Sequence, residues 1–188
     1  MRISLLTAIS LSLLLSTQAQ AEAVTGKAAG KLVFAEGKAE VKLLENVDLP
    51  KEQLKAVKSV LAAQPYFGAM AMSPDEGLMS ESTVATANFH STEAAAAAAV
   101  AQCNAKKTGA TPCVLVAVVQ PKGWKARALQ LSSEATAGFR AGYPAVGGAL
   151  AISTATGVWG MGQNAGAALG ACAETPAKPK DCAVVIEN

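Results

Sequence analysis

The chain has 188 residues, of which 51% are hydrophobic, so it is long and apolar enough to build the core of one ordinary domain. Its 16 basic and 14 acidic residues leave a net charge of +2. This balance gives no support for a nucleic-acid partner, because duplex-binding proteins usually carry a strongly basic face. Five basic residues could form a modest patch that binds anionic envelope polymers: Lys106, Lys107, Lys122, Lys125 and Arg127. We expect instead that they form an ordinary solvated surface.

Residues 1–21 predict a secretory signal peptide. Arg2 gives a basic start, residues 3–15 form an apolar run, and small residues at Ala19 and Ala21 suit a cleavage site. The run is too short for the roughly 20 residues that cross a bilayer, and we expect no membrane span after cleavage. We therefore expect cleavage after Ala21 and a periplasmic or secreted protein whose chain begins at Glu22.

Residues 22–65 predict an N-terminal hairpin and a helix that pack on a main domain. Residues 31–35 and 38–44 have strand character and flank Glu36-Gly37, a candidate two-residue turn. Pro50 then opens an amphipathic helix with Leu54, Val57 and Leu61 on one face, and Pro65 closes it.

Residues 66–188 contain one pattern twice. GAMAMSPDEG at 68–77 and GALAISTATG at 148–157 are identical at five positions, and each is followed by two cysteines ten residues apart. We infer an internal duplication with copies at about 67–119 and 147–187.

Within the first copy, Met70 and Met72 alternate with Ala69 and Ala71, which is the period of a strand. A turn over residues 74–77 and a second strand over 78–88 are expected to follow.

An Ala-rich helix completes each copy. Ser91 and Asn164 stand where a helix N-cap is expected, ahead of alanine runs at 94–101 and 165–173. The first copy is longer between its turn and its first cysteine, which predicts a longer second strand and an extra helical turn there.

Between the copies, residues 113–119 and 126–131 predict successive strands, followed by a helix capped by Ser132 or Ser133 that ends near Gly142. The expected order of elements along the whole chain is then four consecutive ββα units followed by one closing strand. We expect an α+β fold of recurrent ββα units with an internal duplication, in which Ala-rich helices cover the sheet or sheets.

Four cysteines in an exported chain favour disulfides, and three pairings are possible. The equal spacing favours two local bridges, Cys103–Cys113 and Cys172–Cys182, each stabilising the fold by about 2–3 kcal/mol. No Cys-x-x-Cys is present and a single histidine cannot complete a pair of zinc sites, so we expect no redox or metal site.

GMGQNA at 160–165 matches a dinucleotide-binding fingerprint, with Asp181 near the place of the ribose-binding acid. Asp181 precedes the next strand instead of ending it, however, and too little chain follows for the remaining βαβ units. No cofactor is expected.

No catalytic residues are predicted. His90 is the only histidine and stands just before a helix, where capping or exposure explains it, and the usual hydrolase motifs are missing. Asp75 and Glu76 lie in a turn and suggest solvation. The residues nominated for a possible ligand surface are Trp159, Trp124 and His90, with packing against the Ala-rich helix as the plainer interpretation of Trp159.

The second copy resembles a family of exported bacterial domains of unknown function. The resemblance rests on Gly-Ala-Leu-Ala-Ile-Ser, Gly-Val-Trp-Gly, an Ala-rich helix ending in Cys172, and Asp181-Cys182-Ala-Val-Val. It covers residues 66–188, and the first copy departs from it with Met79-Ser80 in place of Trp-Gly. It implies a small secreted domain with no shared catalytic residues.

Similar whole chains are also named 5-aminolevulinate synthase. That activity needs pyridoxal phosphate on a Schiff-base lysine within a large domain, which the short exported chain does not offer.

The sequence therefore favours an exported, disulfide-stapled binding or interaction module that takes an unknown protein or envelope component and performs no catalysis. The alternative is an envelope enzyme of hydrolase type, with a site that no motif reveals and that repeat-related serines and the His90 region would form. A purely structural envelope protein is a third possibility, and 5-aminolevulinate synthase activity is a remote one.

Overall fold

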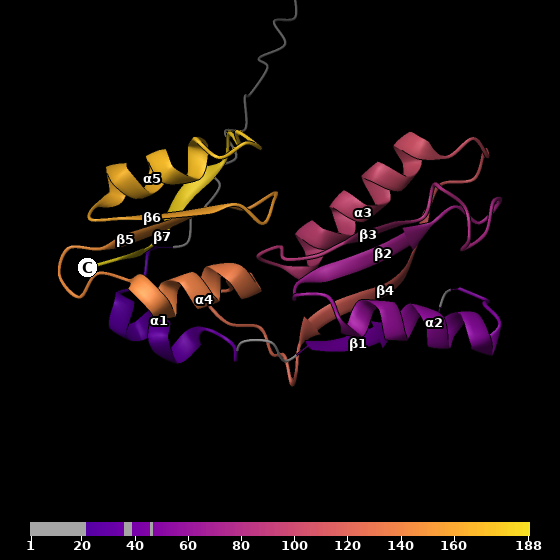
Figure 1. Ribbon diagram of the computed structural model, residues 1–188, viewed down its shortest axis with the longest axis horizontal. Helices are drawn as coiled ribbons and strands as arrows, with labels where there is room; N and C mark the ends of the chain where they lie inside the picture. The colour runs from indigo at the N-terminus through magenta and orange to yellow at the C-terminus, as the bar shows by residue number, and fades with distance from the viewer. Residues whose placement is uncertain (1–21, 36–38, 46) are drawn as a thin grey trace, which may run out of the picture.

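The computed structural model describes residues 22–35, 39–45 and 47–188. The predicted signal peptide at 1–21 and the predicted Glu36-Gly37 turn lie outside the described residues. The described elements fall into two units that lie side by side, each with one antiparallel sheet between helices (Figure 1). The α+β class is confirmed.

The first unit has four strands in the order β1-β4-β2-β3. Its strands are β1 (Ala39–Leu43), β2 (Gly68–Met72), β3 (Val84–Thr86) and β4 (Val114–Pro121). α2 (Lys51–Ala62) covers one face and α3 (Thr92–Lys106) the other (Figure 1). The strand period divides the residues as predicted: Met70 and Met72 pack with α2, and Ala69 and Ala71 pack with α3.

The second unit has three strands in the order β6-β5-β7. Its strands are β5 (Ala149–Ser153), β6 (Trp159–Gly162) and β7 (Cys182–Glu187). α5 (Ala165–Ala173) covers the face with the small residues, whereas α4 (Ser133–Gly142) and α1 (Gly26–Leu32) cover the opposite face (Figure 1).

The two units share their geometry. The order β4-β2-β3 corresponds to β7-β5-β6, and each central strand makes a register shift against its neighbour, between Met70 and Ala71 in one unit and between Leu150 and Ala151 in the other. The disulfides Cys103–Cys113 and Cys172–Cys182 form as predicted, with Cα atoms 6.1 and 6.2 Å apart. Both bridges tie the end of an Ala-rich helix to the next strand.

Local helix signals are confirmed. The Ser91 hydroxyl accepts from the Ala94 amide at the start of α3, Ser132 does the same for α4, and Asn164 for α5. α3 has 15 residues against nine in α5, as the longer first copy predicts.

Several predicted strands are wrong. β3 spans three residues, so the second strand of the first copy is shorter than expected, because residues 78–83 form turns closed by Glu76. Residues 31–35 form no strand: Thr25 caps α1, which extends to Leu32. Residues 126–131 pair with no strand of the described part of the chain either. Within the described residues, two ββα units are therefore complete, β2-β3-α3 and β5-β6-α5.

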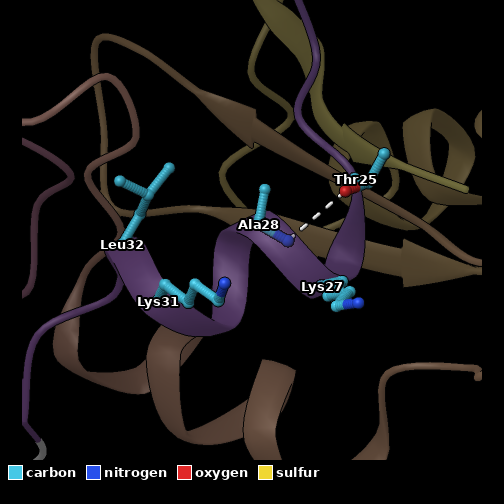
Figure 2. Close-up of a pocket in the computed structure, with 5 residues that line it drawn as sticks. All are labelled: Thr25, Lys27, Ala28, Lys31 and Leu32. Atoms are coloured by element: carbon cyan, nitrogen blue, oxygen red, sulfur yellow. Dashed lines mark hydrogen bonds between the residues drawn. The ribbon is translucent and has the colours of Figure 1, made fainter.

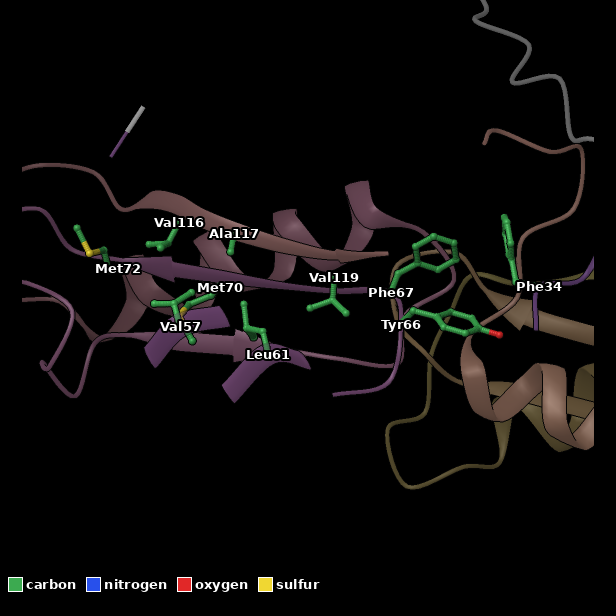
Figure 3. Close-up of a cluster of buried hydrophobic side chains, with 10 residues drawn as sticks. All are labelled: Phe34, Val57, Leu61, Tyr66, Phe67, Met70, Met72, Val116, Ala117 and Val119. Carbon is green, nitrogen blue, oxygen red and sulfur yellow. The ribbon is translucent and has the colours of Figure 1, made fainter. Parts of the chain in front are cut away.

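The N-terminal region is divided between the units. Ala29 and Val33 join the core of the second unit, and Val24 bridges Ile186 beside β7. β1 and α2 belong to the first unit. Phe34 lies between, with its ring edge-on to Tyr66 and Phe67 at the end of the first core that faces α4 (Figure 3).

Candidate functional site

The two units meet at His90, which is only 3% exposed. Its Nδ1 accepts a hydrogen bond from the Ser132 amide (2.9 Å), and its Nε2 lies 3.0 Å from the Val158 carbonyl. A carbonyl only accepts, so Nε2 carries the proton and the ring is neutral. His90 therefore bridges the first unit to α4 and to the β5–β6 turn, and neither capping nor surface exposure describes it.

Burial lowers the pKa of His90 to about 4, against the opposing effects of the Val158 carbonyl and the Asp181 carboxylate. The imidazole is therefore neutral at physiological pH, with both nitrogens engaged by main-chain groups. This arrangement supports a structural role, because an acid or base must have a nitrogen free for substrate.

Asn88 and Gly157 complete this junction. The Asn88 Oδ1 accepts from the Glu134 amide (3.1 Å), and Asn88 holds a positive φ of 63°. A Cβ on Gly157 would lie 2.0 Å from the Asn88 carbonyl oxygen, so only glycine permits the β5–β6 turn to approach this closely.

A groove lies beside the junction, along residues 127–130. It consists of a pocket of about 190 Å³ and a smaller one of about 100 Å³, which share Ala128, Gln130 and Ile152. The larger pocket adds His90, Ser91, Arg127 and Thr154; the smaller adds Glu22, Val24, Leu129 and Val185. We call the two pockets together the junction groove.

The three nominated ligand-surface residues separate in space. His90 forms part of the wall of the groove. Trp124 reaches the groove indirectly, because its Nε1 donates to Gln130 Oε1 (2.7 Å) while its ring packs on the first core. Trp159 packs on α4, where a Cβ on Gly138 would lie 2.1 Å from its ring. Trp159 therefore lies against α4 and not against the Ala-rich α5 that the sequence favoured, because Gly160 and Gly162 are the β6 residues that face α5.

Arg127 has a role that the sequence did not indicate. Its guanidinium donates to the carbonyls of Leu32 and Val33 and lies 3.9 Å above the ring of Phe34. It therefore fastens the N-terminal segment to the groove. Only its place in a run of basic residues marked it beforehand, and that pattern suggested solvation.

A larger but shallower depression lies on α1 (Figure 2). It measures about 350 Å³, and all of its lining comes from the single stretch Thr25–Leu32. The Thr25 hydroxyl is already used to cap the Ala28 amide (Figure 2). Because no second element contributes a polar group, this depression lacks the converging groups of a specific site.

The predicted solvated carboxylates are instead hydrogen-bonded. Glu76 Oε2 accepts from the hydroxyls of Ser80 and Ser82, and Oε1 accepts from the Thr108 and Gly109 amides. These bonds, led by the one from Ser82, lower the pKa of Glu76 well below its usual range. The carboxylate of its neighbour Asp75 accepts hydrogen bonds from the hydroxyl and the amide of Thr111, and these bonds lower the pKa of Asp75 as well. The turn after β2 is thereby fixed to the first disulfide loop.

The second unit makes the same connection in reverse. Asp181, in the disulfide loop, accepts from Ser153, Thr154 and the Ala155 amide in the turn after β5. Burial raises the pKa of Asp181, but these bonds outweigh it and the net pKa is lowered. Asp75 and Glu76 in the first unit and Asp181 in the second therefore hold loops in place, and their carboxylate oxygens are occupied.

The glycines of GMGQNA serve packing. Gly160 and Gly162 lie on β6 directly against α5: a Cβ on Gly160 would lie 2.2 Å from the Cys172 nitrogen. Asn164 caps the helix from within the motif. The strand and helix therefore contact each other where a dinucleotide fingerprint would hold a pyrophosphate.

Among the described residues, no group of three His, Cys, Asp or Glu side chains could hold a metal ion. Within the same part of the chain, no helix is both long enough and apolar enough to cross a membrane. The two disulfides are compatible with an oxidising, extracellular location. Comparison of the chain with protein-family models, curated proteins and solved structures found no significant match.

Proposed function

We propose that the protein is an exported, disulfide-stapled binding module whose site is the junction groove. The main support for this proposal is that four separate parts of the chain line the groove. They are the N-terminal segment, the loop before α3, the 127–130 segment and the second sheet. Segments distant in sequence converge there with hydroxyl, amide and apolar groups, as in a typical binding cleft.

The chemistry of the groove supports binding without catalysis. His90 is neutral and engaged at both nitrogens, and Asp181, whose carboxylate acts on the pKa of His90, is occupied by the turn after β5. Ser91 uses its hydroxyl to cap α3. The Thr154 hydroxyl already donates to Asp181, so what the groove offers a partner is the Gln130 side-chain nitrogen, the charged groups of Arg127 and Glu22, and small apolar side chains. The resemblance to exported bacterial domains and the predicted signal peptide agree with this proposal and stay predictions.

Photo-crosslinking tests the proposal. A benzophenone amino acid replaces Ala128, which is exposed in the groove, and a control protein carries it at Lys58, exposed on α2. On irradiation of the native exported fraction we expect a discrete adduct from position 128 and none from position 58. Identical adduct patterns at the two positions, or no adduct at 128, would contradict a binding site in the groove.

A further inference from the structure

Among the described residues, the main-chain N–H and C=O groups of Ala126–Leu131 have no hydrogen-bond partner. The next two amides do: Ser132 donates to His90 Nδ1, and Ser133 donates to the Tyr66 carbonyl. Main-chain polar groups of a folded protein are normally paired with protein or water. This segment therefore presents a row of free donors and acceptors where it runs along the junction groove.

The segment nevertheless has the burial pattern of a strand. Leu129 and Leu131 are 4% and 0% exposed and pack with α4 and β5, whereas Ala128 is exposed and Gln130 half-buried. This alternation is the period of two that predicted a strand here. The sequence carries a strand pattern, and the described structure supplies no partner strand.

The segment is also held in position along its length. Arg127 is bound to the Leu32 and Val33 carbonyls, Gln130 is bound to Trp124, and the two leucines are anchored in the core. A fixed strand edge can accept a partner strand with little loss of its own conformational freedom.

The sizes of the two pockets decide between a small molecule and a peptide. At about 190 and 100 Å³ they are each smaller than the roughly 300–1,000 Å³ typical of small-molecule sites. They also adjoin each other along the segment, sharing Ala128 and Gln130. Spaced side chains of an extended chain fit this arrangement better than one compact ligand.

The linings of the pockets define the chemistry of the occupant. Val24, Ile152 and Val185 make the smaller pocket mostly apolar, and the larger pocket contains Thr154 and the Arg127 cation. Lys125 and Lys122 are exposed just before the segment and add positive charge at that end.

We propose that an extended segment of another polypeptide adds to Ala126–Leu131 as a partner strand, with a small apolar side chain in the smaller pocket and an acidic side chain beside Arg127 and Lys125. This is the strand-addition mode of recognition, in which main-chain bonds give affinity and side-chain pockets give selectivity. It rests on the proposed function and specifies the class of partner.

A random nonapeptide display library, selected on the disulfide-intact protein, tests this proposal. We expect enriched peptides with an acidic residue and a small apolar residue in register. N-methylation of alternate peptide amides then reduces affinity at least tenfold, and the intervening amides tolerate it, because only one set of amides faces the partner strand. Hydrogen exchange of the amides of residues 126–131 slows when peptide is bound.

Charge variants provide the matched control. Lys125→Glu is expected to weaken binding of the selected acidic peptides about threefold to tenfold, and Lys58→Glu on α2 leaves it unchanged. Affinity indifferent to N-methylation together with unchanged exchange at 126–131 would overturn strand addition, even with peptides bound in the groove. Failure of the library with a cross-link still formed at position 128 would overturn the peptide partner alone; failure of both would overturn the binding function as well.

Discussion

Ser73 and Ser153 occupy corresponding places at the ends of β2 and β5, and both are fully buried. The Ser153 hydroxyl donates to Asp181 Oδ1 (2.7 Å), next to Cys182. The residue that precedes the corresponding Cys113 is Pro112, which has no acceptor side chain, and the Ser73 hydroxyl has no hydrogen-bond partner among the described residues. The two units thus differ at one buried polar contact.

Alanine substitution of the two serines should therefore have opposite effects. Ser153→Ala removes a bond to a charged acceptor and should lower the free energy of unfolding by about 2 kcal/mol. Ser73→Ala removes an unsatisfied hydroxyl and should leave that free energy unchanged or raise it by up to about 1 kcal/mol. Urea unfolding of the oxidised proteins measures both, and equal losses for the two variants would contradict the assigned hydrogen bonds.

At the scale of helices and strands, α5 packs closely on β6 because glycine lies at the contact. A Cβ on Gly160 would meet main-chain atoms of Ala168 and Cys172 at 2.6 and 2.2 Å, and main-chain atoms cannot move aside as a flexible side chain does. At Gly170, within α5 itself, a Cβ would meet no atom within 4 Å beyond the adjacent residues and the backbone of its own helix. One glycine is required by packing and the other only lowers helix stability.

The variants Gly160→Ala and Gly170→Ala test this distinction. Gly160→Ala should lower the free energy of unfolding by about 2 kcal/mol or more, because α5 must shift from the sheet. Gly170→Ala should raise it by up to about 1 kcal/mol through helix propensity. Thermal unfolding followed by circular dichroism measures both, and a tolerated alanine at 160 would show that the contact is looser than described.

Elements that depend on interactions between residues close in sequence were predictable, and elements that depend on distant partners were not. The starts of α3, α4 and α5 were predictable because Ser91, Ser132 and Asn164 bond amides three residues away. Residues 126–131 have a strand pattern and no strand, because pairing depends on a partner that this local pattern does not specify. The cysteine pairing was predicted correctly because each disulfide closes a short loop, in which the two cysteines are ten residues apart.

At the scale of the whole molecule, the candidate site was not predictable, since it arises where two units meet. His90 bonds Ser132 and Val158, which are 42 and 68 residues away, and Arg127 bonds carbonyls 95 and 94 residues away. Periodicity and motifs report on near neighbours, so they marked His90 as an isolated residue and Arg127 as one charge in a patch. The groove follows from the docking of units, each of which was partly predictable by itself.

The single histidine makes this docking sensitive to acid. The pKa of His90 is about 4 in the folded protein and about 6.5 when unfolded, so the folded state binds fewer protons between these values. The contribution of His90 to the free energy of unfolding is complete above pH 6.5 and is lost as the pH falls toward 4, a total of about 3 kcal/mol.

Denaturant unfolding at several pH values measures this loss. His90→Gln keeps a donor and an acceptor but does not titrate, so it should remove most of the pH dependence of the free energy of unfolding above pH 4.5. An unchanged slope in that variant would show that carboxylates such as Asp181 carry the acid sensitivity and that His90 does not couple the two units to pH.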